Sequence, residues 1–400
     1  MRIADNINEL LIDAVKEGGT DLHISVGTQP RVRVHGELRS LNYQILTPAS
    51  MSNLVNPLLD ALAKTTLNST GQYDMSYSIP KVARFRVNIF RQKGDLAGVF
   101  RVLNSEVPDY TSLGLPLSIF NLYRSRRGLI LIVGVTGSGK STSLYALIKE
   151  IKDDTVNIVT LEDPVEYKMD GVNQIQVNAE VGLTFASGLR SILRQDPDIV
   201  MVGEIRDNET ANLAIQAALT GHLVFSTLHT NSAAGVLPRL LDMGIEPFLI
   251  ASTVNTIIGQ RLVRRVARRR DIYQSSPLET QAIREAVGGL LPQTREQVAQ
   301  YAQDLGYESL PLATQASFAL AKGKDTPQTP RGYAGRAGLY EVMDITEEIQ
   351  NLIVKRATSA EIQRMAIQQG MITMRQDGYL KALNGITTIE EVNRVAADTA

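Results

Sequence analysis

Hydrophobic and polar residues alternate along much of the first hundred positions. This alternation, typical of half-buried strands, occurs along four segments: 21–26, 31–38, 83–91 and 96–103. Apolar residues recur at helical spacing along 3–17 and 49–63, which predicts two helices. Helices and strands in this order predict a small α+β domain over residues 1–105. A stretch with Pro and Gly residues then predicts a linker over 106–116.

The rest of the chain has short, continuous aliphatic runs instead. They are Leu129–Val135, Val156–Leu161, Ile199–Val202 and Leu223–Phe225. Runs that are apolar on both faces predict a buried parallel sheet covered by helices, and therefore an α/β domain over 117–400. Within it, the Gln-, Ala- and Thr-rich residues 271–331 predict a helical insertion with a flexible tail. Residues 332–400 predict a helical C-terminal part.

Composition restricts the chemistry. The 400 residues include no cysteine, which excludes disulfides, thiolate catalysis and thiolate-bound zinc, so no zinc is expected. With 41 basic and 42 acidic residues, the chain as a whole is not a polyanion binder. The longest apolar run has seven residues, whereas a membrane-spanning helix needs about 20. The N-terminus lacks the pattern of a secretory signal. These features predict a soluble intracellular chain.

A phosphate-binding loop is predicted at Gly134–Ser141, whose sequence GVTGSGKS follows a predicted strand and precedes a predicted helix. Glycines allow successive backbone N–H groups to turn toward phosphate oxygens, and the helix N-terminus adds positive potential. Lys140 is expected to reach the β- and γ-phosphates, and the Ser141 hydroxyl to bind Mg²⁺. The candidate nucleotide-binding residues are Gly134, Thr136, Gly137, Ser138, Gly139, Lys140, Ser141 and Thr142. The alternative is a Gly-rich turn that binds no nucleotide.

Carboxylates follow two of the aliphatic runs. Glu162 and Glu166 come after the second run, and Glu204 follows the third. The carboxyl ends of parallel strands share one sheet edge with the bound ligand, so a carboxylate there can polarise an attacking water. Gly203 occupies the position where a Walker B motif usually has Asp, which predicts that Glu204 acts alone or with Glu162 or Glu166. Solvated loop or helix-cap residues are the alternative.

Polar residues also follow the fourth aliphatic run. Ser226, Thr227 and His229 are positioned to sense the γ-phosphate by hydrogen bonding. A lone histidine is more often structural than catalytic, and His229 could equally brace a loop. His222, at the start of this run, is interpreted as structural or interfacial.

Four segments in this order, 134–141, 161–167, 189–207 and 220–233, resemble the Walker A, Asp, Walker B and His boxes of the secretion ATPase superfamily. Members of that superfamily drive type II secretion and type IV pilus assembly or retraction. The resemblance implies a RecA-like P-loop ATPase core preceded by a PAS-like α+β domain. It also implies a homo-hexamer that hydrolyses ATP with Mg²⁺.

The resemblance further assigns four arginines to the phosphates. Arg86 and Arg101 belong to the N-terminal domain, and their contact with ATP would close the two domains until hydrolysis releases it. Arg190 and Arg194 precede the Walker B segment, and their spacing of four predicts one helix face. The alternative is that all four are surface arginines paired with acids.

Different parts of the chain indicate different branches of the superfamily, pilus retraction on one side and pilus assembly or secretion on the other. The N-terminal region begins with one small domain, as in retraction motors, and the four-cysteine zinc module of assembly ATPases is absent after Gln260–Arg265. However, Tyr333–Glu341, 370–381 and 385–392 resemble the assembly and secretion branch. We therefore favour assembly or secretion, with pilus retraction as the alternative.

The resemblance also implies partners and location. The motor would dock at the cytoplasmic face of the inner membrane onto a membrane-embedded platform protein, with only peripheral membrane association. Residues 261–270 include six arginines, which could contact lipid, acidic partner loops or a neighbouring subunit. DNA translocation is disfavoured because no aromatic residue for base stacking lies between Phe248 and Tyr273, so no nucleic acid is expected. A regulator that binds ATP without hydrolysing it is the third alternative.

Overall fold

The computed structural model describes residues 2–34, 37–103, 106–119 and 126–396. The chain forms two compact units, one of Met1–Glu106 with Glu166–Lys168, and one of Val107–Val165 with Met169–Ala400. Residues 35–36, within a predicted strand, and 104–105, at the predicted domain boundary, lie outside the described residues.

The first unit is built on a six-stranded antiparallel sheet. Its strands, in the order in which they pair, are β3 (Glu37–Ser40), β2 (Arg31–Val34), β1 (Asp21–Ser25), β6 (Asp95–Leu103), β5 (Ala83–Gln92) and β4 (Gln72–Ile79). In β5, Phe85 and Val87 are fully buried while Arg86 between them is exposed, so the sheet has one apolar face. This alternation confirms the predicted half-buried strands.

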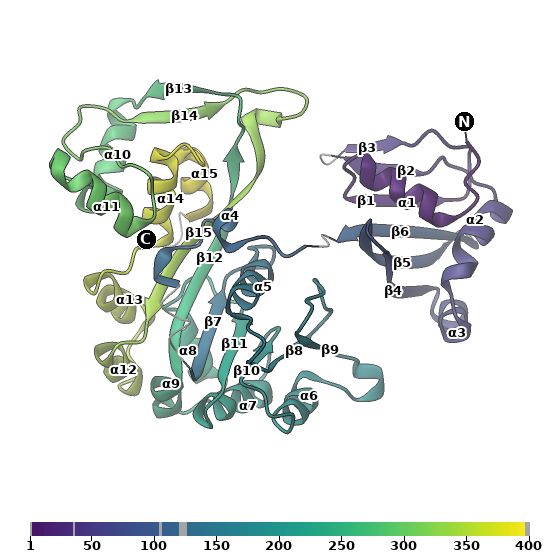
Figure 1. The fold of residues 1–400 in the computed structure, drawn as a ribbon, viewed down its shortest axis with the longest axis horizontal. Helices are drawn as coiled ribbons and strands as arrows, with labels where there is room; N and C mark the ends of the chain where they lie inside the picture. The colour runs from purple at the N-terminus through teal and green to yellow at the C-terminus, as the bar shows by residue number, and fades with distance from the viewer. Residues whose placement is uncertain (1, 35–36, 104–105, 120–125, 397–400) are drawn as a thin grey trace. The chain divides into compact units, whose positions relative to one another are not determined.

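Three helices pack on the sheet of the first unit and share its core (Figure 1). They are α1 (Ile7–Lys16), α2 (Pro48–Val55) and α3 (Ala61–Thr70). The single helix predicted over 49–63 is therefore wrong. A 3₁₀ turn at Asn56–Leu58, which contains a proline, ends α2. The Asp60 carboxylate then accepts a hydrogen bond from Ala63 N and begins α3.

The second unit is built on a seven-stranded sheet. Its strands, in the order in which they pair, are β15 (Tyr333–Asp344), β12 (Val254–Val266), β7 (Gly128–Val133), β11 (Leu223–Leu228), β10 (Ile199–Val202), β8 (Ile158–Glu162) and β9 (Asn173–Gln176). Neighbouring strands are parallel except for β15, which is antiparallel to β12. Every residue of β7, β8, β10 and β11 is buried. The predicted buried parallel sheet is confirmed.

Helices on this sheet bury the central core of the second unit (Figure 1). They include α6 (Phe185–Ile192), α7 (Asn208–Leu219), α8 (Val236–Asp242), α9 (Pro247–Thr253), α12 (Glu347–Val354) and α13 (Ser359–Gln368). A further helix, α5 (Lys140–Ile151), directly follows the loop after β7. Because β7, β8, β10 and β11 are parallel, the loops that follow them lie along one edge of the sheet.

The last third of the chain differs from the sequence-based expectation. Residues 332–400 are not only helical, since β15 opens this stretch and pairs with β12. The expected helical insertion contains α10 (Pro277–Val287) and α11 (Val298–Leu305), but also a hairpin of β13 (Arg270–Gln274) and β14 (Ala319–Gly323). These helices share a core with α14 (Met374–Leu383) and α15 (Ile389–Ala396).

The predicted linker contains a short helix, α4 (Tyr110–Leu113), which packs against α5. Lys149 of α5 holds the start of this segment, donating to Val107 O at 3.1 Å and to Asp109 Oδ1 at 2.7 Å. In the described part of the chain, none of the helices has the length and apolar character required to cross a bilayer.

Candidate active site

The loop after β7 is shaped by glycines. Gly134, Gly137 and Gly139 have φ values of 153°, 79° and 86°, in the region that side chains disfavour. At Gly134, an added Cβ would also lie 2.3 Å from the Gln260 carbonyl oxygen of β12. The glycines therefore meet both a conformational and a steric requirement of a loop that wraps its N–H groups around an anion.

Lys140 begins α5 and lies against this loop. It is 7% exposed, and its Nζ donates to Gly134 O at 2.9 Å and to Val135 O at 3.2 Å. Burial lowers the pKa of Lys140, and the negative charge of Glu204 partly opposes that shift. The electrostatic effect of Glu204 on Lys140 links the end of β10 to the loop after β7.

Glu204 lies two residues beyond the end of β10. The residue between, Gly203, passes close to β8: its N donates to Leu161 O at 2.8 Å, and an added Cβ would lie 3.2 Å from that same oxygen. The tight approach favours glycine where an aspartate is usual. The carboxylate then comes from the next residue.

The Glu204 carboxylate has two charged or polar neighbours. Its Oε1 lies 2.5 Å from Arg206 Nη2, and its Oε2 lies 3.5 Å from His229 Nε2. The Glu204 side chain is 15% exposed and that of His229 is 48% exposed. The structure thus brings together Glu204 and His229, which the sequence placed in separate boxes.

Glu162 at the end of β8 has a different environment. It is 2% exposed and accepts hydrogen bonds from the Tyr145 hydroxyl, from Thr160 Oγ1 at 2.5 Å and from Gln174 Nε2 at 3.2 Å. Its oxygens are held by donors of three elements. Glu166, the other candidate partner of Glu204, is half-buried and belongs to the segment Glu166–Lys168 of the first unit.

The hydroxyls of Ser226 and Thr227 bind the neighbouring strand. Ser226 Oγ donates to Val202 O and Thr227 Oγ1 to Gly203 O, each at 2.8 Å. These bonds tie the end of β11 to the end of β10. The predicted role of these hydroxyls in sensing the γ-phosphate stays a prediction.

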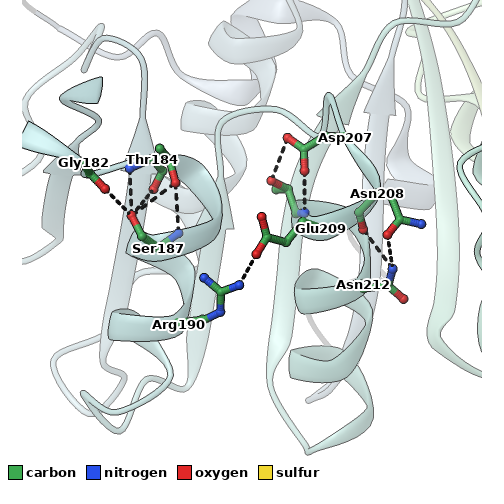
Figure 2. Close-up of polar contacts among 9 residues, drawn as sticks. Gly182, Thr184, Ser187, Arg190, Asp207, Asn208, Glu209 and Asn212 are labelled. Atoms are coloured by element: carbon green, nitrogen blue, oxygen red, sulfur yellow. Dashed lines mark hydrogen bonds and ion pairs between the residues drawn. The ribbon is translucent and has the colours of Figure 1, made fainter. Parts of the chain in front are cut away.

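Arg190 and Arg194 do not share a helix face, contrary to the prediction. Helix α6 ends at Ile192, and Arg194 Nη1 turns back to donate to Arg190 O at 2.9 Å. Arg190 pairs with Glu209 in the first turn of α7, as Figure 2 shows. Both arginines are exposed at the C-terminal end of a short helix.

Arg86 and Arg101 lie in the first unit. They are directly opposite each other on β5 and β6, and both are exposed. Arg101 Nε donates to Asp21 Oδ1 at 2.8 Å. Burial alone would raise the pKa of Asp21, but the hydrogen bonds from Arg101 and Thr20 outweigh burial and lower it. Asp21 therefore orients the Arg101 guanidinium.

The chain matches a family of known proteins along nearly its whole length. The family described as type II/IV secretion system protein matches residues 1–394. The chain belongs to this family. The predicted resemblance to secretion ATPases is thereby confirmed.

The relatives to which the chain is similar include both type II secretion proteins and type IV pilus assembly ATPases. The type II secretion system protein E of Xanthomonas campestris pv. campestris is 42% identical over 307 residues, which is 75% of this chain and 50% of the relative. The type IV pilus assembly ATPase PilB of Pseudomonas aeruginosa is 37% identical over 98% of this chain and 67% of its own. The chain thus spans half to two thirds of these two relatives.

Comparison with a solved structure supports the fold. The crystal structure of the pilus retraction motor PilT with bound ADP matches with a TM-score of 0.74 and 29% identity, over 98% of this chain and 97% of that one. The mixed α/β architecture of the present chain is therefore similar to that of PilT.

Sequence reasoning missed several residues that build this family site. Tyr145 holds Glu162, Arg206 holds Glu204, and Gln260 Nε2 donates to Ser138 O at 2.9 Å. Arg206 lies in the quoted Walker B segment and could have been noted as a charge beside Glu204. No local signal marks Tyr145 or Gln260, because their partners are distant in the sequence.

Proposed function

We propose that this chain is a motor ATPase that hydrolyses ATP to power type IV pilus assembly or type II secretion. The observation that carries the proposal is the loop of Gly134–Ser141 with Lys140 held in it and Glu204 paired with His229 at the ends of the neighbouring strands. A carboxylate and a phosphate-binding lysine at one sheet edge are the elements of phosphoryl transfer to water.

The loop fits a triphosphate. Ser138 Oγ is buried and has no hydrogen-bond partner among the described residues, so a bound phosphate oxygen would satisfy it. Gly134, Gly137 and Gly139 allow N–H groups to converge; Thr136 lies between the first two of them and Thr142 follows Ser141. Ser141, exposed in the first turn of α5, is the hydroxyl that would hold Mg²⁺. When bound, Mg²⁺ neutralises charge on the phosphate oxygens.

Glu204 is the proposed general base. Its partly exposed carboxylate can accept a proton from a water molecule while His229 and Arg206 fix its orientation. Lys140 supplies positive charge for the phosphates, and we propose the same role for Arg190 and Arg194. Glu162, with both oxygens held, supports the strand end, and Glu166 is kept as an assisting carboxylate.

The family resemblance supports the remaining parts of the proposal. We propose a homo-hexamer of RecA-like cores, in which Arg86 and Arg101 of the PAS-like first unit contact ATP when the units close. Loss of the γ-phosphate would then release that contact. The motor would act at the cytoplasmic face of the inner membrane on a platform protein, held there peripherally.

Pilus retraction is the second candidate. The structural comparison supports it, since the crystal structure of the retraction motor PilT matches this chain with a TM-score of 0.74. Identity favours assembly or secretion, at 37% to PilB against 29% to PilT. The C-terminal segments quoted above support the same branch.

Phosphate release by the purified full chain tests the ATPase. We expect hydrolysis to be lost in Lys140→Ala, and an equal rate in both proteins would contradict the proposal. Surface pili of cells carrying Lys140→Ala, counted by electron microscopy, then test the direction. Bald cells support assembly, whereas hyperpiliated cells support retraction.

A further inference from the structure

A buried glutamate outside the reaction centre contacts the loop that carries His229. Glu341 of β15 is 2% exposed, and its Oε1 accepts a hydrogen bond from Ala233 N at 2.6 Å. Ala233 is fully buried and lies between His229 and the start of α8. A carboxylate is costly to bury, so its position in contact with this loop calls for a reason.

The neighbouring strand is shaped to admit this carboxylate. Gly259 of β12 lies directly opposite Glu341 in the register of the two strands. An added Cβ at Gly259 would lie 2.7 Å from both Cγ and Oε1 of Glu341. Glycine in the interior of a long strand weakens it, and here it gives the glutamate room to reach the loop.

The second carboxylate oxygen faces the beginning of α14. Glu341 Oε2 lies 3.5 Å from Met374 N, the first residue of that helix. A helix N-terminus favours a negative charge, which helps to hold the side chain in this orientation. The same glutamate thus joins β15, α14 and the His229 loop.

The next residue of β12 holds the other loop of the site. Gln260 is 2% exposed, and its Nε2 donates to Ser138 O of the phosphate-binding loop at 2.9 Å. Gln260 pairs with Tyr340, and Gly259 with Glu341. Adjacent positions of the β12–β15 pair therefore fix the phosphate loop and the His229 loop.

We propose that Glu341 is a positioning residue that fixes the loop of residues 229–235 so that His229 stays beside Glu204. The loop can transmit this restraint, because Thr230 Oγ1 donates to Ser232 O at 3.0 Å and Gly235 N to Ser232 Oγ at 3.3 Å. The placement of His229 is a structural claim. Its effect on the rate rests on the proposed ATPase function.

Histidine NMR tests the placement without any assay of activity. The chain has four histidines, so labelled imidazole signals can be assigned by substitution. We expect the His229 signal to shift and narrow in Glu341→Leu, which lacks an acceptor for Ala233 N. Glu341→Gln retains an acceptor oxygen and should restore the signal. An unchanged His229 signal in Glu341→Leu would overturn the proposal.

A matched control is available in the same unit. Glu391 is also fully buried and accepts from a backbone N–H, Arg264 N at 3.1 Å, but binds neither loop of the site. Glu391→Leu, which likewise removes a buried acceptor, should leave the His229 signal unchanged; if it moves the signal as Glu341→Leu does, the effect is general loosening and the proposal fails. If Glu341→Leu does not fold, Gly259→Ala displaces the same carboxylate and should give the same shift.

Kinetics separate this proposal from the proposed function. We expect Glu341→Leu to lower kcat by about 10- to 100-fold with KM for ATP within twofold, because misplacement affects the reacting geometry and not ground-state binding. A shifted His229 signal in a chain that never hydrolyses ATP would support the placement and contradict the ATPase. A raised KM with unchanged kcat would contradict the positioning role.

Discussion

The neighbouring strands β8 and β10 each lead into a glutamate at the same sheet edge, yet the two glutamates have different environments. Glu162 is 2% exposed and accepts hydrogen bonds from Tyr145, Thr160 and Gln174. Glu204 has a partly exposed side chain beside Arg206 and the half-exposed His229. A general base needs an oxygen that a water molecule can reach, so we propose Glu204 as the base and Glu162 as a support of the strand end.

The difference arises from the residues around each strand end. Thr160 and Glu162 are two residues apart in β8, so their side chains lie on the same face of the sheet. Gln174 of the neighbouring strand β9 is paired with Thr160, and hydroxyl and amide donors therefore surround the Glu162 carboxylate. Glu204 follows a glycine and lies beyond the strand. The two glutamates therefore differ in the hydrogen-bond donors around them, although both follow a strand at the same edge of the sheet.

Substitution of Glu204 should have the largest effect. We expect Glu204→Gln to lower kcat by about 10²- to 10⁴-fold, because the amide cannot accept a proton from water. Binding of ATP, followed by fluorescence of a labelled nucleotide, should stay within threefold. A variant that turns over at the wild-type rate would remove Glu204 from the mechanism.

His229 should have an intermediate effect. It touches the base at 3.5 Å but is not proposed to take the proton itself. We expect His229→Ala to lower kcat about tenfold, equivalent to about 1.4 kcal/mol of transition-state stabilisation. If steady-state phosphate release falls as far as in Glu204→Gln, His229 contributes as much to the reaction as Glu204, and its merely supporting role is contradicted.

Glu162 should affect stability more than rate. In Glu162→Gln the amide nitrogen faces a hydroxyl or amide donor, and an unsatisfied buried group costs about 1–3 kcal/mol. We expect the free energy of unfolding of the second unit, measured by denaturant titration, to fall by that amount, with kcat reduced less than about fivefold. A larger loss of kcat in a fully folded protein would make Glu162 catalytic and reverse the comparison.

The smallest effect concerns pH. Burial lowers the pKa of Lys140, and the charge of Glu204 raises it in part. Removal of that charge in Glu204→Gln should lower the pKa of Lys140 further. As pH rises, Lys140 in this variant should then lose its proton at a lower pH than in the wild type. The affinity for ATP should fall at that lower pH as well. Affinity measured across the alkaline range checks this. The same curve in Glu162→Gln should match the wild type.

The sequence predicts the centre of the fold well. The four aliphatic runs become β7, β8, β10 and β11, because residues buried on both faces of a parallel sheet must be apolar throughout. The glycine spacing of residues 134–139 likewise reports directly on the backbone conformation of the loop.

Strands at the side of the sheet were not predicted. Strand β12 contains arginines among its buried residues, which obscures the apolar pattern of a strand. One of them, Arg264, fits there because it pairs with Glu391 of α15, 127 residues away. In β15, Glu341 is buried only because Gly259 leaves space for it. Such pairings depend on tertiary contacts that no local pattern encodes.

Site residues on short elements were also difficult to place. The i,i+4 spacing of Arg190 and Arg194 predicts one face only while the helix continues, and α6 ends at Ile192 between them. The hydroxyls of Ser226 and Thr227 donate to Val202 O and Gly203 O, contacts that the sequence did not indicate. Motif spacing identifies which residues gather at the sheet edge, but not which hydrogen bonds they have already made.

We propose that Glu204 is the carboxylate that activates water at the nucleotide. The most direct test is an experimental structure of the full chain as Glu204→Gln, trapped with ATP and Mg²⁺. In that structure we expect the side chain of residue 204 to lie nearest the γ-phosphate with one water between them, while Glu162 keeps its bonds to Tyr145 and Thr160. A water held instead by Glu162, with residue 204 turned away, would show that Glu204 is not the base.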